Sequence, residues 1–434
     1  MTTTDDRGTA DGKLTLAEVL ESFSSGRLPL KFEAYDGSSA GPEDAELGLS
    51  LLTPRGTTYL ATAPGDLGLA RAYVAGDLAA LGVHPGDPYE LLKALADKVE
   101  FKRPPLRVLA NIVRSIGFEH LLPIAPPPQE ALPKWRRMAE GLRHSRIRDA
   151  EAIHHHYDVS NAFYELVLGP SMTYTCACYP RPDATLEEAQ ENKYRLVFDK
   201  LRLQPGDRLL DVGCGWGGMV RYAARRGVRA TGVTLSAEQA GWAQRAIADE
   251  GLTDVARVVH GDYRDVRDGQ FDAVSSIGLT EHIGVANYPA YFRFLRDRLR
   301  TGGLLLNHCI TRPHNRPGHI GGFIDRYVFP DGELTGSGRI IATAQDTGLE
   351  VLHEENLRHH YALTLRDWCA NLVRNWDDAV AEVGVATAKV WGMYMAGSRV
   401  GFETNVVQLH QVLAVKLDEH GADGGLPLRP WWTP

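Results

Sequence analysis

The stretch RLLDVGCGWGG, residues 208–218, decides the fold of this 434-residue chain. Leu209, Leu210 and Val212 form an apolar run that is typical of a buried strand, and closely spaced glycines follow it. Glycines leave out side chains where a backbone must approach a ligand, and residues 219–226 then have the pattern of a helix. A strand, a glycine turn and a helix in this order predict that a nucleotide-like ligand lies over the turn.

The next predicted strand helps to choose between a dinucleotide and S-adenosylmethionine, which both use such a turn. A dinucleotide-binding fold places an acid about 20 residues further on, at the ribose hydroxyls. The segment RATGVTLS, residues 229–236, has no carboxylate, but Thr234, Ser236 and Gln239 offer polar groups for a ribose or a methionine end. Asp262, at the end of a further strand, stands where the adenine amine of S-adenosylmethionine commonly finds an acceptor. The pattern therefore favours S-adenosylmethionine.

Composition limits the kind of protein. With 44% hydrophobic residues the chain can bury a large core and form two domains. Its five cysteines include no CxxC pair, which argues against a disulfide framework and fits a reducing cytoplasm. No stretch approaches the ~20 apolar residues of a membrane span, and the net charge of -8 argues against nucleic acid as a partner. We expect a cytoplasmic protein, either soluble or peripheral on the inner face of the membrane.

The predicted elements divide the chain into parts. Residues 1–13 are predicted to be a disordered tail, residues 14–122 a smaller amino-terminal α+β domain, residues 123–134 a stiff proline-rich linker and residues 421–434 a second tail. In residues 135–420 helices or long loops follow the strands RLLDV, RATGV, ARVVH, FDAVSSI and GGLLLNHCI. This alternation predicts an α/β domain with a doubly wound, mostly parallel sheet.

Positive charge gathers in residues 98–148, which hold eleven Lys or Arg against four Glu. Within this stretch, residues 106–116 place apolar side chains at helical spacing, with Arg107 and Arg114 between them. Such a helix can lie on an anionic membrane surface, and it can equally pack its apolar stripe on the protein core. The sequence leaves both interpretations open.

Two further clusters of polar residues suggest a site. HHHYDVSN, residues 154–161, holds three adjacent histidines, but neighbours on a helix point in different directions and cannot converge on one ion, so we predict no metal. SIGLTEHIG, residues 276–284, follows the fourth strand, where doubly wound sheets carry their ligands. We therefore expect Glu281 and His282 near the reacting group. We expect His308 at the end of the next strand, and Tyr361 closing the pocket.

Several motifs occur in the order found in one family: HHHYDVSNAFYELVL, MTYTCACY, LLDVGCGWGG, GVTLSAEQ, EHIG and HHYALTLRDW. Together they resemble the cyclopropane fatty acid synthase family, which includes mycolic acid cyclopropane synthases and fatty acid methyltransferases. The resemblance covers roughly residues 153–416, and LGLARAYVAGDL, residues 67–78, resembles the amino-terminal domain of the phospholipid-acting members. It implies a class I S-adenosylmethionine methyltransferase that modifies a cis double bond in an acyl chain of a phospholipid.

The resemblance also assigns site residues by position. Around S-adenosylmethionine it places Tyr174, Thr175, Gly213, Gly215, Thr234, Leu235, Gln239, Asp262 and Tyr263. Around a bicarbonate ion it places Glu281, His308, Tyr361, Cys176 and Ile310, the last two through backbone groups. All five bicarbonate positions match the family in type, which implies an active enzyme.

The implied chemistry makes demands on the site. An alkene is a weak nucleophile, so the sulfonium methyl must be held in line with the double bond. Methyl transfer leaves a carbocation, which requires an apolar tunnel that excludes water. Candidate tunnel residues are Phe163, Tyr179, Phe323, Tyr327, Trp391, Tyr394 and Phe402. The resemblance assigns the final removal of a proton to bicarbonate.

The sequence leaves the product and two other functions open. Loss of a proton from the new methyl closes a cyclopropane, whereas loss from a neighbouring carbon gives a methylene chain that a separate reductase would turn into a methyl branch. Thr280 departs from the common family pattern, and its hydroxyl beside Glu281 can shift the base. A small-molecule S-adenosylmethionine methyltransferase and a non-catalytic lipid-binding protein are the alternatives. A homo-oligomer stays open as well.

Overall fold

The computed structural model of the chain describes residues 12–26, 28–99, 102–131, 159–267, 269–316, 320–330 and 332–432. The chain forms two compact units. The amino-terminal unit comprises residues 1–131, 321–328 and 372–400, and the sheet unit comprises residues 132–320, 329–371 and 401–434. The amino-terminal unit thus includes two segments that the sequence analysis placed in the 135–420 domain.

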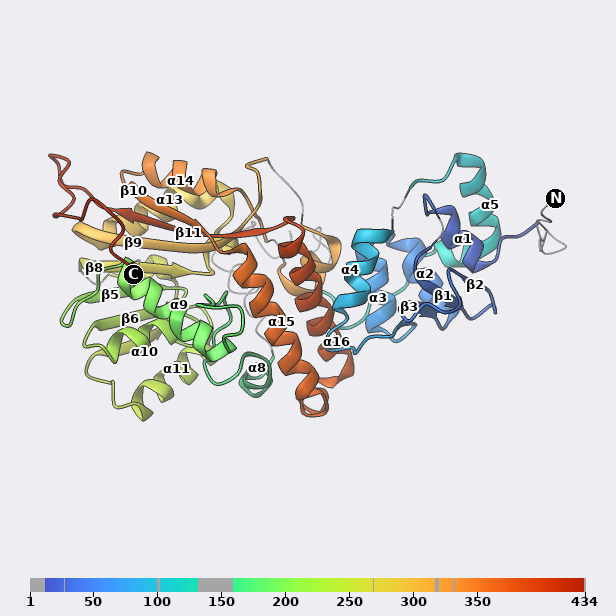
Figure 1. The fold of residues 1–434 in the computed structure, drawn as a ribbon, viewed down its shortest axis with the longest axis horizontal. Coiled ribbons are helices and arrows are strands. Elements are labelled where there is room, and N and C mark those ends of the chain that lie inside the picture. The colour runs from blue at the N-terminus through green and yellow to red at the C-terminus, as the bar shows by residue number, and fades with distance from the viewer. Residues whose placement is uncertain are drawn as a thin grey trace. The chain divides into compact units, whose positions relative to one another are not determined.

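The sheet unit is built on seven strands in the order β10-β11-β9-β8-β5-β6-β7 (Figure 1). Their bounds are β5 Arg208–Val212, β6 Arg229–Thr234, β7 Ala256–His260, β8 Phe271–Ile277, β9 Leu299–Thr311, β10 Glu350–Asn356 and β11 Gln408–Val415. The strands from β9 to β7 are parallel, which confirms the predicted doubly wound sheet. The antiparallel edge of β11 and β10 was not predicted.

Helices cover both faces of this sheet (Figure 1). One face packs on α9 Leu186–Lys200, α10 Gly218–Ala224 and α11 Ala237–Asp249, and the other on α13 Tyr288–Arg298 and α14 Ser337–Asp346. The remaining elements near the site are α8 Asn161–Leu168, η3 Tyr263–Asp265, α12 Thr280–Ile283, η4 Val285–Asn287 and the first part of α15 Arg358–Arg374. Two cores result, one on each face.

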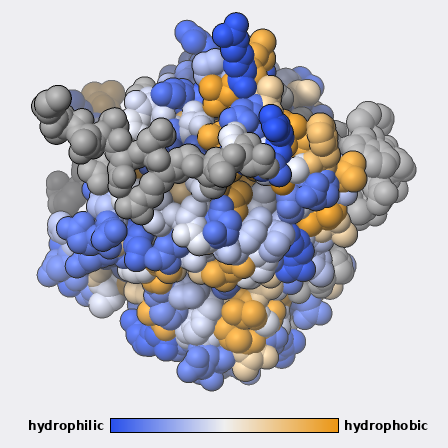
Figure 2. Space-filling view, turned by 90° about the vertical axis from the view of Figure 1, so that its right-hand side faces the viewer, coloured by the Kyte–Doolittle hydropathy of each residue, from blue (hydrophilic) through white to orange (hydrophobic). Residues whose placement is uncertain are grey.

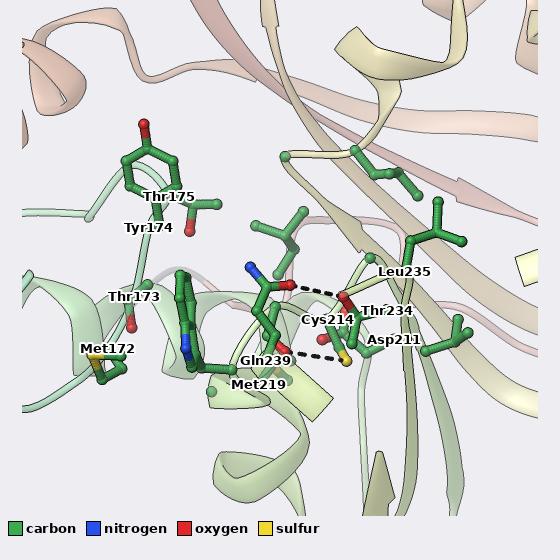
Figure 3. Close-up of a pocket in the computed structure, with 18 of the residues that line it drawn as sticks. Met172, Thr173, Tyr174, Thr175, Asp211, Cys214, Met219, Thr234, Leu235 and Gln239 are labelled. Carbon is green, nitrogen blue, oxygen red and sulfur yellow. Dashed lines mark hydrogen bonds between the residues drawn. The ribbon is translucent and has the colours of Figure 1, made fainter. Parts of the chain in front are cut away.

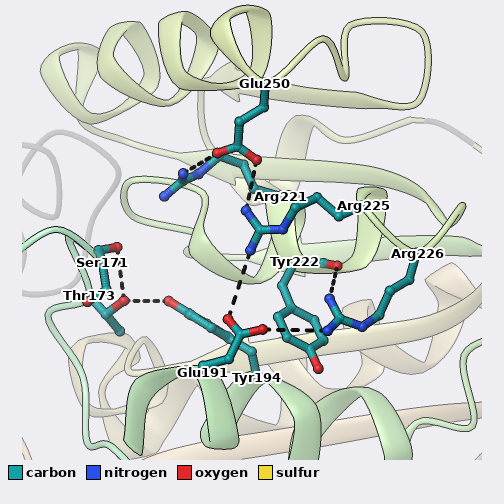
Figure 4. Close-up of polar contacts among 9 residues, drawn as sticks. All are labelled: Ser171, Thr173, Glu191, Tyr194, Arg221, Tyr222, Arg225, Arg226 and Glu250. Atoms are coloured by element: carbon teal, nitrogen blue, oxygen red, sulfur yellow. Dashed lines mark hydrogen bonds and ion pairs between the residues drawn. The ribbon is translucent and has the colours of Figure 1, made fainter. Parts of the chain in front are cut away.

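Charged groups hold α10, the helix that follows the glycine turn (Figure 4). Arg221 and Arg225 contact the carboxylate of Glu250 at 2.5 and 2.8 Å. Glu191 of α9 lies 3.5 Å from Arg226 and 4.0 Å from Arg225. Ion pairs at such partly exposed sites add little stability each, but together they orient α10 against its neighbours.

The amino-terminal unit has the α+β character that the sequence predicts. Its four strands, β1 Lys31–Ala34, β2 Ser39–Ala40, β3 Gly48–Leu51 and β4 Leu78–Leu81, form a sheet in the order β2-β1-β3-β4. Its helices are α1 Leu16–Ser22, α2 Pro54–Thr62, α3 Asp66–Val74, α4 Tyr89–Lys98, α5 Leu106–Ile116, η1 Phe118–Leu121, η5 Ile324–Val328 and most of α16 Trp376–Glu403. None of the helices in the described ranges is both long and apolar enough to span a membrane.

The described part of the predicted linker packs on the amino-terminal unit. The buried carboxylate of Glu130 accepts hydrogen bonds from Arg71 at 2.6 and 2.7 Å and pairs with Arg326 at 2.5 Å. A buried carboxylate requires such partners, because an unpaired charge in the interior is costly. This segment is therefore part of the unit's core rather than a spacer.

The carboxyl-terminal residues differ from the tail that the sequence suggested. Trp431 and Trp432 pack against the core on the sheet face that α9, α10 and α11 cover. The indole N–H of Trp431 donates to the carbonyl oxygen of Asp199 at 2.8 Å. Two adjacent tryptophans carry enough apolar area to dock a chain end on its own unit.

Candidate active site

The glycine turn adopts backbone dihedral angles that residues other than glycine rarely adopt. Gly213, Gly215 and Gly217 all have positive φ, at 79°, 53° and 73°. A Cβ at Gly213 would lie 2.9 Å from the Cβ of Leu279, which is too close for any real side chain. The turn therefore requires glycine here both for its conformation and for space.

A cavity lies over this turn (Figure 3). Eight of the nine residues that the family resemblance assigned to S-adenosylmethionine line it: Tyr174, Thr175, Gly213, Gly215, Thr234, Leu235, Gln239 and Tyr263. Gln239 is oriented at two points, since Thr234 donates to its amide oxygen at 2.7 Å and Ser236 caps its backbone N–H at 3.2 Å. This leaves the amide nitrogen of Gln239 on the cavity side in Figure 3.

Asp262 is not among the residues lining this cavity. Its two carboxylate oxygens accept hydrogen bonds from the guanidinium of Arg264 at 2.7 and 2.5 Å, and one of them also caps the backbone N–H of Arg264 at 2.9 Å. Asp262 thus holds the η3 turn in place, and its role toward adenine stays a prediction.

Sequence reasoning missed two buried charged groups in the wall of the cavity. Lys193 of α9 is fully buried, and its ammonium donates to the hydroxyl of Thr175 at 2.9 Å. Burial lowers the pKa of Lys193 to about 7 and raises the pKa of Asp211, at the end of β5, to about 6. Asp211 accepts a hydrogen bond from Ser275 at 2.6 Å. The sequence did contain a signal for Lys193, because this lysine falls on the face of the helix 186–200 that the apolar pattern marks as buried.

Aromatic side chains form another wall. The ring of Trp216 lies 4.7 Å from that of Tyr164, and its N–H donates to Asn161 at 2.8 Å. Tyr174 lies 5.3 Å from Trp368, measured between ring centroids. Of the candidate tunnel residues, Phe163, Tyr179 and Phe402 belong to the sheet unit, and Phe323, Tyr327, Trp391 and Tyr394 to the amino-terminal unit. The tunnel itself stays a prediction.

A second group of residues, which we call the Glu281 cluster, comprises Cys176, Glu281, His308, Ile310 and Tyr361. The backbone N–H of Ile310 donates to the carboxylate of Glu281. The N–H of Gly278 donates to the carbonyl oxygen of His308 at 2.8 Å. A Cβ placed on Gly278 would lie 2.8 Å from Thr175 Cγ2 and 4.0 Å from Glu281 Oε1, so the cluster adjoins the cavity.

The other two members of the Glu281 cluster meet at Leu357. The carbonyl oxygen of Leu357 accepts a hydrogen bond from the Tyr361 N–H at 3.2 Å, and the thiol of Cys176 lies 3.9 Å from it. Burial raises the pKa of Cys176 well above its usual value, so it is a neutral thiol. The ring of Tyr361 lies 4.6 Å from that of Phe402.

The Glu281 cluster contains buried polar atoms that lack partners. Among the residues that the structure describes, neither Glu281 Oε2 nor His308 Nε2 has a hydrogen-bond partner. Burial raises the pKa of Glu281 to about 7 and lowers that of His308 well below its usual value. Near neutral pH His308 is therefore neutral and Glu281 is about half protonated, so both groups can donate hydrogen bonds. That donor set fits a small oxyanion such as bicarbonate.

Thr280 lies behind the Glu281 cluster. Its fully buried hydroxyl accepts a hydrogen bond from Asn307 at 2.5 Å. Asn307 and His308 are neighbours on β9, so their side chains point to opposite faces of the sheet. The hydroxyl of Thr280 thus makes its hydrogen bond with Asn307 on the face of the sheet opposite the His308 side chain. His154 to His156 and the basic segment after residue 131 lie outside the described residues.

Residues 144–412 match the family of mycolic acid cyclopropane synthetases. A probable fatty acid methyltransferase of Mycobacterium tuberculosis is 74% identical over 98% of this chain and 99% of its own length. A tuberculostearic acid methyltransferase of the same organism is 32% identical over 93% of this chain and 91% of its own length.

Solved structures agree with these relatives. The cyclopropane synthase MmaA2 from Mycobacterium tuberculosis superposes with a TM-score of 0.58 at 32% identity, covering 62% of this chain and 98% of that chain. The mycolic acid cyclopropane synthase CmaA1, complexed with SAH and CTAB, superposes with a TM-score of 0.58 at 33% identity, with the same coverage.

Proposed function

The chain belongs to the family of mycolic acid cyclopropane synthetases and has their class I methyltransferase fold, and we propose that it transfers a methyl group from S-adenosylmethionine to the cis double bond of an unsaturated acyl chain of a phospholipid. One observation carries the proposal. The cavity over the glycine turn meets the buried Glu281 cluster at Thr175 and Gly278. A methyl donor and a proton-removing group can therefore act on the same carbon atoms.

S-adenosylmethionine, when bound, supplies a methyl group made electrophilic by its sulfonium. The glycine turn allows the backbone to approach it, and the Gln239 amide and the Thr175 hydroxyl are polar groups that can orient it. Lys193 positions Thr175 through its hydrogen bond. Orientation of this kind is worth up to about 7–11 kcal/mol of the barrier, which a weakly nucleophilic alkene needs.

The aromatic walls serve the step that follows methyl transfer. A carbocation on the acyl chain is attracted to the faces of aromatic rings, and the exclusion of water prevents its capture. Tyr174, Trp368, Tyr361 and Phe402 form a continuous run of rings in the sheet unit, with neighbouring centroids 4.6 to 6.1 Å apart. Tyr174 at one end of this run lines the cavity, so the run begins at the cofactor site.

Removal of a proton completes the reaction. A bicarbonate ion, if bound in the Glu281 cluster, would supply a base for that proton. His308 Nε2 and Glu281 Oε2 are the buried atoms available to hold it, and the Ile310 N–H fixes the Glu281 carboxylate. Deprotonation of the new methyl closes a cyclopropane, whereas deprotonation of a neighbouring carbon yields a methylene chain for a separate reductase.

The test is mass spectrometry of acyl chains after incubation of the purified protein with S-adenosylmethionine and oleoyl phospholipid vesicles. We expect a product heavier by one CH2. A product that resists hydrogenation is a cyclopropane, and one that takes up hydrogen is a methylene chain. An unchanged acyl mass, in a protein that binds S-adenosylhomocysteine by calorimetry, would point to a small-molecule substrate. No heat with S-adenosylhomocysteine would point to a lipid-binding protein without catalysis.

We also propose that the amino-terminal unit binds the anionic inner face of the membrane. Ile112 of α5 is buried, whereas Leu106, Phe118 and Leu122 are 77%, 75% and 68% exposed. The helix thus uses only part of its apolar stripe for the core. Figure 2 shows hydrophobic side chains beside strongly hydrophilic ones on the face of the molecule that it draws. The exposed Arg107 supplies the charge that anionic lipid attracts.

Flotation with phosphatidylglycerol vesicles tests this surface. We expect the wild type to float at low salt, and a variant with Leu106→Ser, Phe118→Ser and Leu122→Ser to remain with the soluble fraction. Leu428→Ser, which changes a fully exposed leucine of the sheet unit, is the matched control and should float. Equal flotation of the triple variant would remove α5 and η1 from the membrane contact.

A further inference from the structure

We propose that Lys200 and Gln411 are positioning residues that set the tautomer of His308, so that its buried Nε2 carries the proton and donates to the anion in the Glu281 cluster. The presence of an anion in this cluster depends on the proposed function above. The assignment of the tautomer does not depend on it, because it follows from hydrogen bonds within the chain.

Lys200, Gln411 and His308 are linked by hydrogen bonds, and we call these three residues the relay. Gln411 and His308 lie in one row across the antiparallel edge of the sheet. Gln411 of β11 lies directly opposite His308 of β9, and Glu355 of β10 lies directly opposite Gln411. Directly opposite residues on neighbouring strands project from the same face, so the three side chains can follow one another. Lys200, at the end of α9, reaches the same row.

Lys200 determines which way the Gln411 amide points. The ammonium of Lys200 donates to Gln411 Oε1 at 2.8 Å, and an ammonium has donors only. The reversed amide would place its NH2 group against the ammonium, with two donors facing each other. The NH2 group of Gln411 must therefore face His308 Nδ1, which lies 3.1 Å away.

The orientation of this amide determines the proton on His308. An NH2 group donates, so Nδ1 must accept and cannot carry a proton. Burial, with Lys193 and Lys200 nearby, lowers the pKa of His308, so the ring is neutral and has one proton. That proton is then on Nε2, the atom that has no partner among the described residues. The relay thus presents an N–H donor to the Glu281 cluster.

The relay is closed to water. Lys200, Gln411 and His308 are each no more than 1% exposed. Glu355 pairs with Lys200 at 2.5 Å, and the ring of Trp432 lies 5.5 Å from the Lys200 ammonium. The docked end of the chain thus covers the cation on which the relay depends.

NMR of protein labelled with nitrogen-15 in its histidine rings tests the tautomer without substrate or cofactor. We expect the His308 signals to show a protonated Nε2 and an unprotonated Nδ1. Gln411→Glu replaces the donor by an acceptor of the same shape, so the proton should move to Nδ1. Gln408→Glu, on the same strand but bonded to Asn405, is the matched control and should leave the tautomer unchanged.

Lys200→Met is the second variant, in case Gln411→Glu does not fold. It frees the amide to turn, so His308 should show a mixture of both tautomers. A protonated Nδ1 in the wild type, or an unchanged tautomer in whichever variants fold, would overturn the relay. These outcomes are independent of methyl transfer, so a failed activity assay would reject the proposed function and leave the relay in place.

Titration with bicarbonate tests the donor role in the same samples. We expect bicarbonate to shift the His308 Nε2 signal of the wild type. Its affinity should fall by at least about 10-fold in Gln411→Glu, as happens when outer partners of ligand-holding histidines are changed. Affinity for S-adenosylhomocysteine should stay the same. A His308 signal that bicarbonate does not move would overturn the donor role.

Discussion

The cavity over the glycine turn and the Glu281 cluster adjoin each other, but they are built in opposite ways. Most of the cavity's predicted residues lie within two short segments, 213–239 and 172–175, and glycines of the turn form part of its lining. The Glu281 cluster takes one or two residues from each of three elements, α12, β9 and α15, and Cys176 from a loop. Gln411 and Lys200 come from two more elements, β11 and α9. The cavity should therefore be sensitive to steric changes, and the cluster to changes of a single polar atom.

The largest expected effect is that of Glu281→Gln. This change keeps the shape of the side chain and replaces one oxygen that faces the cluster. We expect turnover to fall by about 10²–10⁴-fold, as when acid–base catalysis is lost, because the variant no longer holds the base. Affinity for S-adenosylhomocysteine should be unchanged. Product formation and calorimetry measure the two quantities. The control is Glu419→Gln at an exposed position, and equal losses in both variants would contradict a specific role for Glu281.

The pH dependence of stability isolates the same carboxyl group. Its pKa is about 7 in the folded chain and 4.5 as the ordinary value, so between pH 4.5 and 7 the folded state holds a proton that the unfolded state releases. Stability relative to Glu281→Gln should therefore fall by about 3 kcal/mol as the pH rises through this window, and stay level above it. Thermal unfolding of both proteins at several pH values measures it. A difference independent of pH would mean that the Glu281 pKa is not raised.

A steric change tests the cavity. Gly213→Ala adds a methyl group that meets Leu279 at 2.9 Å, in a backbone with φ of 79°. We expect the affinity for S-adenosylhomocysteine to fall by about 10-fold, because the turn must shift by an amount worth about 1–2 kcal/mol. Gly206→Ala has a similar φ of 95° but open space, and is the matched control for backbone strain. Equal affinity in the two variants would show that crowding at Leu279 does not matter.

The docked chain end should give the smallest effect. Trp432→Ala removes the ring over Lys200 and the contact with His353 at 5.0 Å, so we expect a loss of about 1–2 kcal/mol in the free energy of unfolding. Leu428→Ala, at a fully exposed side chain, should change it by less than about 0.5 kcal/mol. Chemical denaturation measures both. Equal stability of Trp432→Ala and the wild type would show that the chain end contributes no packing.

The residues that sequence could predict are those whose neighbours lie close by in the chain. The positive φ angles of Gly213 and Gly215 arise within the unit β5–turn–α10. The bonds from Thr234 and Ser236 to Gln239 arise within the next unit, β6–turn–α11. Asp262 lies just beyond the end of β7, and its role toward adenine stays a prediction. The sequence did not predict that the guanidinium of Arg264, two residues later, binds its carboxylate.

Sequence by itself thus determined the parallel sheet, the glycine turn and the motifs that place the chain in its family, because periodicity and turn chemistry are local. Only the tertiary structure decided the antiparallel edge and the assignment of residues 372–400 to the amino-terminal unit. It also decided the buried hydrogen bonds of Lys193, Lys200 and Gln411. The physical reason is that a buried polar group acquires its protonation, orientation and pKa from partners far away in the chain. Glu281 and His308 were recognisable as residues, but their chemistry depends on what the fold places around them.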